Sequence, residues 1–125
     1  MSDSPFLQIP ESEWLCSNGL AFAVSDRYPV SPGHALVITK RLIPTWVEAS
    51  TEEKLAIMEL VDRLLSELGD ELSPDGFNVG FNIGTHAGQT VPHLHVHVIP
   101  RFAGDVEDPT GGIRFVIPDK ANYLT

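Results

Sequence analysis

One cysteine, Cys16, is present among the 125 residues. A single thiol cannot form a disulfide within the chain and cannot make a Cys-x-x-Cys metal clip. The longest apolar runs fall well short of the ~18 residues that a membrane-spanning helix needs. The first residues, 1–4, also lack the basic and then apolar pattern of a secretory signal. These absences lead us to expect a cytoplasmic protein that has no membrane partner.

Basic residues are scarce in this chain. The 8 lysines and arginines stand against 17 aspartates and glutamates, which gives a net charge of −9 at pH 7. Such a balance disfavours binding to nucleic acid and to anionic lipid. A phosphate-bearing ligand would therefore be held by local donors, namely backbone amides, imidazoles and a nearby cation such as Arg101 or Arg114. The length is that of one domain, and we expect residues 1–125 to form it.

Three of the 5 histidines occupy every second position of the segment HLHVHVI at residues 93–99. In an extended strand the three imidazoles would line one face, and Leu94, Val96 and Val98 would line the other. Apolar and polar alternation does not require histidine, because serine, threonine, lysine or glutamate satisfies it equally well. Histidine, with an ordinary pKa of about 6.5, is suited to nucleophilic attack, proton transfer and metal binding near pH 7. The segment therefore predicts a strand with one apolar face, which packs in the core, and one histidine face, which carries the chemistry.

The rest of the pattern predicts one long helix and three further strands. Ser50 and Glu53 have the spacing of a capping box, apolar residues recur at helical spacing after them, and Gly69 offers a C-terminal stop. We expect the apolar face of this helix to pack in the core. The expected strands are residues 21–25, 34–39, 78–82 and 94–99.

The histidine segment and its flanks resemble the histidine-triad (HIT) family of nucleotide hydrolases and transferases, whose signature is His-x-His-x-His-x-x with x apolar. The likeness extends to FAVSDRYPVSPGH at residues 22–34 and to FNVGFNIGTHAGQTVPHLHVHVIPR at residues 77–101. It implies an α+β fold, in which an antiparallel sheet of about five strands carries one long helix and a shorter one packed on it. The flanking GQTV and IPR resemble the branch of the family that splits dinucleoside polyphosphates.

The resemblance also implies roles for four histidines. His95 would attack an adenylyl phosphorus, provided that one ring nitrogen is unprotonated and the other is held by an acceptor such as a backbone carbonyl. His97 would donate to the phosphate oxygens, and His93 would orient His95 or relay protons. His34, which follows a Pro-Gly pair, matches a separate, fourth active-site histidine of the family.

Four further residues resemble substrate contacts of the family. Gln89 and Thr90 would hydrogen-bond the leaving-group side and the phosphate. Asn82 would contact the phosphate or the ribose, and Asp26 would accept from the ribose hydroxyls. Taken alone, each is an ordinary polar loop residue, and Asp26 is also a turn former. His86 has no counterpart in the family, and we expect it to be exposed to solvent.

The resemblance implies asymmetric hydrolysis of a dinucleoside polyphosphate to AMP and a second nucleotide, through a covalent histidine–AMP intermediate. Two alternatives use the same adduct: hydrolysis of nucleoside phosphoramidates, and phosphorolysis, in which inorganic phosphate replaces water. No resident cofactor is expected, and a divalent cation such as Mg²⁺ would arrive with the polyphosphate. Because relatives form two-fold dimers, we also expect a homodimer, with the tail at residues 103–125 near the interface.

A different class of protein stays open, a histidine metal-binding protein without nucleotide chemistry. Three histidines on one strand face, with His34 opposite, would offer nitrogen ligands to Zn²⁺ or Cu²⁺. Same-face neighbours on a strand lie ~6.5 to 7 Å apart, so three in a line do not readily converge on one tetrahedral ion, whereas two can. We therefore predict no metal ligand among the site residues.

Overall fold

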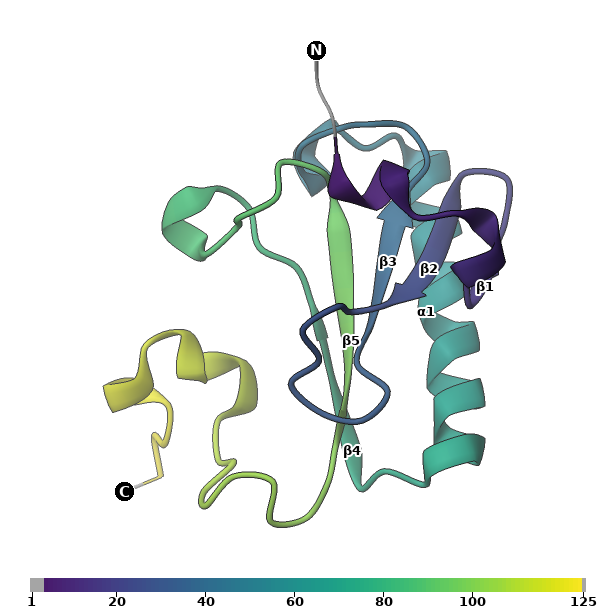
Figure 1. Ribbon diagram of the computed structural model, residues 1–125. Coiled ribbons are helices and arrows are strands. Elements are labelled where there is room, and N and C mark those ends of the chain that lie inside the picture. Colours follow the sequence, from purple (N-terminus) through teal and green to yellow (C-terminus); the bar gives the residue numbers. More distant parts are fainter. Residues whose placement is uncertain (1–3, 125) are drawn as a thin grey trace.

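A five-stranded antiparallel sheet with one long helix forms the framework of the protein, a computed structural model in which residues 4–124 are described. The strand order across the sheet is β1-β2-β3-β5-β4. Figure 1 shows α1 along one side of the sheet and the C-terminal segment, drawn in yellow, on the side away from α1. In chain order, the strands and the α-helix are β1 (Cys16–Ser17), β2 (Ala21–Ser25), β3 (Ala35–Thr39), α1 (Thr51–Leu72), β4 (Gly76–Gly80) and β5 (His95–Arg101).

The sheet and the long helix confirm the predicted α+β architecture. Within residues 4–124, α1 is the single α-helix, so the shorter second helix of the prediction is represented by 3-10 turns alone. In this part of the chain no helix has the length and apolar character needed to cross a membrane. The 3-10 helices are η1 (Pro5–Gln8), η2 (Glu11–Glu13), η3 (Trp46–Glu48), η4 (Thr85–Ala87), η5 (Gly112–Val116) and η6 (Pro118–Lys120).

Both faces of the sheet are covered, because β2 and β3 are apolar on both sides. On β2 and β3, three of the buried side chains that pack in the α1 cluster are alanines, Ala21, Ala23 and Ala35, and their small size lets the helix approach closely. The opposite face carries larger side chains, which pack against the N-terminal segment, residues 4–14. This second cluster consists of Phe22, Val24, Leu36 and Ile38, with Phe6, Ile9 and Trp14 packed against it.

The strand β5 divides its side chains between these two layers. Leu94, Val96 and Val98 are buried in the α1 cluster. His95 and His97 face the other way, because their register partners on β3 belong to the opposite cluster. The predicted alternation is therefore confirmed for residues 94–98.

The strand also continues through Pro100, where the prediction ended it. Pairing between β3 and β5 extends no further than Ala35 with Val98, so Pro100 needs no N–H directed toward β3. It stands opposite Phe77 of β4 instead. The strand predicted at residues 78–82 lies two residues earlier, as β4, and the pattern does not predict β1, because two residues are too few to show alternation.

The helix α1 begins where the capping box predicts. Ser50 Oγ accepts from the Glu53 N–H at 3.0 Å, and the Glu53 carboxylate accepts from the Ser50 N–H at 2.9 Å. The predicted stop at Gly69 is wrong: the helix continues to Leu72, and a residue in the left-handed conformation ends it. The extra turn places Leu72 over Gly33, where a Cβ would lie 2.5 Å from Leu72 Cδ1. Packing of Leu72 therefore outweighs the weak helix propensity of glycine at this point.

A buried carboxylate ties the start of α1 to the chain after β3. Arg41 Nη2 and Nε donate to the two oxygens of Glu53 at 2.6 and 3.0 Å, and Glu53 is 4% exposed. These hydrogen bonds, with the Arg41 guanidinium as the largest cause, lower the pKa of Glu53 from 4.5 to about 2. Glu53 is therefore ionised throughout the neutral and mildly acidic range.

We expect Glu53→Gln to lower the free energy of unfolding by about 2 kcal/mol at pH 7, because a charge-assisted hydrogen-bond pair is lost. Since the folded-state pKa is depressed, this stabilisation is complete above pH 4.5 and disappears as the pH falls toward 2. Urea unfolding of both proteins from pH 7 down to about pH 3 measures the loss. Glu67→Gln is the control, because its exposed pair with Arg63 contributes less than about 0.5 kcal/mol. Equal losses in the two variants would contradict this prediction.

Candidate active site

A pocket of about 850 Å³ opens on the sheet face opposite α1, which is within the size range of small-molecule sites. Its walls come from parts of the chain that are distant in sequence: the N-terminal segment, β2 with the turn after it, β3, the loop after β4, and β5. Apolar and polar side chains both contribute. The lining includes Phe6, Ile9, Val24, Asp26, Arg27, Leu36, Asn82, Thr90, His95 and His97.

His95 lines this pocket, and one hydrogen bond determines which of its ring nitrogens carries the proton in the neutral ring. Its Nδ1 lies 2.7 Å from the carbonyl oxygen of His93. A carbonyl oxygen can only accept, so in the neutral imidazole Nδ1 carries the proton and Nε2 carries the lone pair. No group within residues 4–124 forms a hydrogen bond to Nε2. The backbone carbonyl thus imposes the tautomer that nucleophilic attack requires.

His93 lies just before β5 and is fully buried, away from the pocket lining. Its Nε2 lies 2.7 Å from the Thr39 carbonyl oxygen, so Nε2–H is the donor. Its Nδ1 then accepts from the Ser4 hydroxyl at 2.6 Å. Because both ring nitrogens are paired, the His93 ring has no nitrogen available to a bound ligand. The ring instead fixes the position of residue 93, whose carbonyl oxygen contacts His95.

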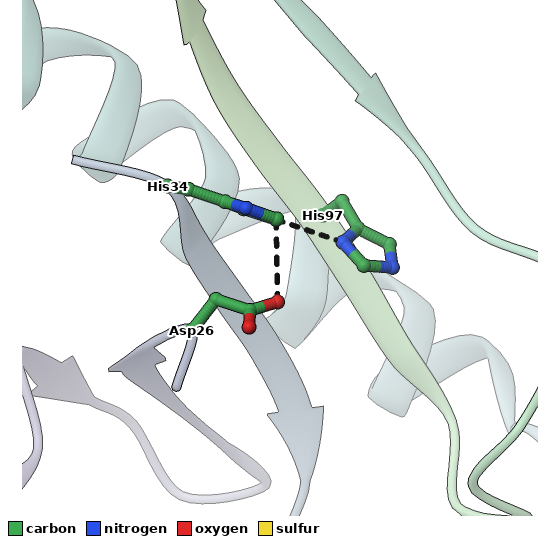
Figure 2. Close-up of side chains that lie close together, drawn as sticks. All are labelled: Asp26, His34 and His97. Atoms are coloured by element: carbon green, nitrogen blue, oxygen red, sulfur yellow. Dashed lines mark hydrogen bonds and ion pairs between the residues drawn. The ribbon is translucent and has the colours of Figure 1, made fainter. Parts of the chain in front are cut away.

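A chain of hydrogen bonds fixes the tautomer of His97 as well, and Figure 2 shows the side chains involved. The Val30 N–H donates to His34 Nδ1 at 3.1 Å, so the proton of the His34 ring is on Nε2. That Nε2 lies 2.9 Å from His97 Nδ1 and 3.4 Å from Asp26 Oδ2. His97 Nδ1 therefore accepts, and its Nε2 is left as an N–H donor at the pocket. The structure thus brings His34, which the resemblance names as a fourth active-site histidine, next to His97.

Burial keeps these imidazoles neutral. It is the largest cause of a lowered pKa at His34 and His93, and it lowers the pKa of His97 to about 4. Positive charge on His95 or His34 would lower the pKa of His97 further, whereas the Asp26 carboxylate raises it. At pH 7 the hydrogen-bonded chain therefore consists of neutral rings, each with one donor and one acceptor.

Asp26 forms a turn contact with one carboxylate oxygen and lines the pocket with its side chain. Its Oδ1 accepts from the Tyr28 N–H at 2.7 Å, which is the turn-forming contact typical of aspartate. Its Oδ2 faces His34 at 3.4 Å, and the side chain lines the pocket. A carboxylate oxygen is thus held at the pocket wall, where a ligand hydroxyl can donate to it.

Gln89 has its side chain turned into the protein. It is 9% exposed, and its Oε1 accepts from the Gly84 N–H at 2.9 Å. Its Nε2 donates to the carbonyl oxygens of Pro44 at 2.6 Å and Val91 at 3.0 Å. The pocket lining does not include it. In this structure Gln89 closes the loop around η4, rather than offering the ligand contact that the resemblance implies.

Asn82 and Thr90 keep free hydrogen-bonding groups at the pocket. Both line it, and neither side chain has a hydrogen-bond partner within residues 4–124. An amide and a hydroxyl without protein partners are available to a polar ligand. His86, in η4, is exposed as predicted. Three of the four expected contact residues therefore reach the pocket.

The basic residue of the pocket, Arg27, is one that sequence reasoning missed. It is exposed, lines the pocket, and has no ion-pair partner in the part of the chain that is described. Of the arginines named from the sequence, Arg101 donates to Asp105 and Asn78, and Arg114 donates to backbone carbonyls near the C-terminus. No sequence pattern distinguishes Arg27 from these two, because its place depends on the pairing of β2, β3 and β5.

Within residues 4–124, one group of ligand-type atoms is present, on Asp26, His34 and His97, and these atoms lie within 4.8 Å of one another. The hydrogen bonds oppose metal binding there. His34 accepts the Val30 N–H at Nδ1, so its proton occupies Nε2, the atom that would have to bind the ion. A metal site made of His93, His95 and His97 is not formed either, because both ring nitrogens of His93 have hydrogen-bond partners in the core.

Fold and site together define an α+β domain with a strand-borne histidine site. The family model "HIT domain" matches residues 8–104. A member of the HIT family from Bacillus subtilis, of known structure, superposes with a TM-score of 0.76 at 30% identity, over 83% of this chain and 77% of that one. The chain belongs to the HIT family, and the resemblance seen in the sequence is confirmed.

Two curated relatives illustrate the family. The bis(5'-adenosyl)-triphosphatase of Dictyostelium discoideum is 36% identical over 100 residues, which are 80% of this chain and 67% of that protein. The AP-4-A phosphorylase of Mycobacterium tuberculosis is 37% identical over an alignment of 122 residues, which covers 91% of this chain and 62% of that protein. The chain thus spans about two thirds of the length of either relative.

The hydrogen-bonded chain predicts that His97 stays neutral in mild acid. We expect its ring resonances to titrate near pH 4, because burial and the adjacent imidazoles disfavour the imidazolium. In His34→Ala the pKa of His97 should rise by about one unit, since a neighbour that can carry positive charge is removed and water enters. An NMR titration of the histidine rings measures both values. Titration of His97 near its ordinary value of 6.5 would contradict the prediction.

The burial of Gln89 leads to a second prediction for this site, which concerns the stability of the fold. Gln89→Glu replaces two N–H donors with a carboxylate oxygen that faces two carbonyl oxygens, so the free energy of unfolding should fall by about 2 kcal/mol. Thr90→Val, next to it and exposed, should change the free energy of unfolding by less than about 0.5 kcal/mol. Thermal and urea unfolding measure the difference. A Gln89→Glu protein as stable as wild type would show that the side chain does not support the loop.

Proposed function

We propose that the protein is a nucleotide hydrolase that acts through a covalent AMP adduct on His95. The observation that carries the proposal is the 2.7 Å hydrogen bond from His95 Nδ1 to the His93 carbonyl oxygen, which leaves Nε2 unprotonated at the pocket. A neutral imidazole held in one orientation is a competent nucleophile toward phosphorus. Membership of the HIT family supports the proposal, since two relatives are named a bis(5'-adenosyl)-triphosphatase and an AP-4-A phosphorylase.

The proposed reaction has two steps. His95 Nε2 attacks the adenylyl phosphorus, a P–N bond forms, and the bond from phosphorus to the bridging oxygen breaks, so that this oxygen leaves with the second nucleotide. The Nε2–H of His97 donates to the non-bridging oxygens as their negative charge grows. Water then attacks the same phosphorus, the P–N electron pair returns to His95, AMP leaves, and the proton of the water is released to solvent.

The pocket chemistry supports a dinucleoside polyphosphate as the substrate. Phe6, Ile9 and other apolar side chains offer a wall for a base, and the Asp26 carboxylate offers an acceptor for ribose hydroxyls. Free donors for phosphate oxygens are present at Asn82 and Thr90, and Arg27, which has no ion-pair partner within residues 4–124, lines the same pocket. In a chain of net charge −9, such local groups are what can hold a polyphosphate.

Phosphorolysis is the second candidate, and one observation favours it: the match to the AP-4-A phosphorylase extends over 91% of this chain. The adduct on His95 would be the same, and inorganic phosphate would accept the AMP group to give ADP. Hydrolysis of nucleoside phosphoramidates is the third candidate, because it needs the same nucleophile and releases an amine instead of a nucleotide.

The working form that we propose is a cytoplasmic homodimer without a resident cofactor, with Mg²⁺ arriving on the polyphosphate. Exposed apolar side chains in the tail support a dimer contact near residues 103–125. They are Ile113, Phe115, Val116 and Ile117.

The decisive variant is His95→Ala. It should lower the kcat for AMP release at least about 10³-fold, because the nucleophile is gone, and leave the affinity for AMP within about threefold, because the pocket remains. Chromatographic analysis of chelator-treated enzyme with diadenosine tri- and tetraphosphate and adenosine phosphoramidate measures the products. AMP binding by calorimetry measures the pocket.

The control is His86→Ala, an exposed histidine outside the pocket lining, which should keep full activity. Repeating the assay with inorganic phosphate separates the first two candidates, since hydrolysis gives AMP and phosphorolysis gives ADP. Equal turnover in wild type and His95→Ala, or turnover that requires an added transition metal, would contradict the proposed function.

A further inference from the structure

Ser4 is a polar residue buried against the strand histidines, although it lies near one end of the chain. It is 3% exposed, and its Oγ lies 2.6 Å from His93 Nδ1. Because His93 Nε2 donates to the Thr39 carbonyl, Nδ1 is an acceptor and the Ser4 hydroxyl must be the donor. A buried imidazole acceptor 89 residues away in sequence is thus satisfied by the N-terminal segment.

The His93 ring matters because the same residue holds the nucleophile. The His93 carbonyl oxygen accepts from His95 Nδ1 at 2.7 Å, and the His93 N–H donates to the Val91 carbonyl at 2.8 Å. Ser4 and Thr39 pin the ring from its two nitrogens, so the peptide unit that carries the carbonyl has little freedom to rotate. Two hydrogen bonds, joined through the covalent frame of His93, therefore connect Ser4 to the orientation of His95.

Ser4 also positions a second contact to the nucleophile. Its Oγ accepts from the Phe6 N–H at 3.2 Å and so caps η1. The Phe6 ring then lies edge-on against His95, with centroids 5.0 Å apart, and tilted against His93 at 5.7 Å. The capped turn thus places an apolar ring beside the catalytic imidazole, where it limits the rotation of that ring about χ2.

We propose that Ser4 is a positioning residue for His95: through the His93 ring and the Phe6 turn, it holds the Nδ1–H tautomer and the direction of Nε2. The proposal rests on the proposed function of His95 as nucleophile. Ser4 is not among the residues that line the pocket, so its effect is expected in catalysis rather than in nucleotide affinity.

The test compares Ser4→Ala, which removes the donor, with Ser4→Thr, which keeps a hydroxyl. Ser4→Ala should lower kcat about tenfold to hundredfold, because small misplacements of a reacting atom cost this much, and should leave KM within about twofold. Ser4→Thr should recover kcat to within about threefold of wild type. Ser50→Ala is the matched control: it removes another serine cap, at the start of α1, and should lower stability without changing kcat.

A readout without substrate separates positioning from loss of stability and from failure of the proposed function. In ¹⁵N-edited NMR spectra, wild type should show His95 as the Nδ1–H tautomer alone, and Ser4→Ala should show a mixture of both tautomers. This result would support the proposal even if wild type proved inactive on every nucleotide, an outcome that would contradict the proposed function instead. An unchanged His95 tautomer in Ser4→Ala, or a kcat equal to that of wild type, would overturn the role of Ser4.

Discussion

The hydrogen bond between His95 Nδ1 and the His93 carbonyl oxygen decides which nitrogen of His95 is available at the pocket. The bond can do so because His93 is itself immobile: both ring nitrogens are paired and the ring is fully buried. Fully satisfied polar groups in a low-dielectric interior are rigid, since any rotation leaves one of them unpaired. The orientation of His95 on β5 therefore depends on a histidine that lies outside the pocket lining.

Neutral imidazoles give the site its chemical character. Burial lowers the pKa of His34 and His97, and the Val30 N–H sets the direction of the hydrogen bonds that join them. The result is an acceptor on His95 and a donor on His97 at neighbouring positions, with ring centroids 5.3 Å apart. A hydrogen-bond acceptor and a hydrogen-bond donor are thus placed side by side at the pocket, and Arg27 adds a cation to the same lining.

Several features of this architecture follow from local pattern. The capping box at Ser50 begins α1 as expected, because the reciprocal hydrogen bonds involve residues only three apart. Local pattern does not predict where α1 and β5 end, because both ends depend on long-range contacts. Leu72 continues the helix because it packs on Gly33, and Pro100 remains in β5 because β3 has already ended there. Both depend on contacts between segments that are far apart in sequence.

The sequence alone determined the alternation of β5, the family, and the identity of the histidines, since a period of two fixes which side chains share a face. Tertiary structure decided what each residue does. The side chains of Gln89 and His93 lie in the interior, where they donate to the backbone carbonyls of Pro44 and Thr39. Arg27 lines the pocket because the turn after β2 places it there. Hydrogen-bond partners and burial are set by segments that meet only in the folded chain, and no local pattern encodes them.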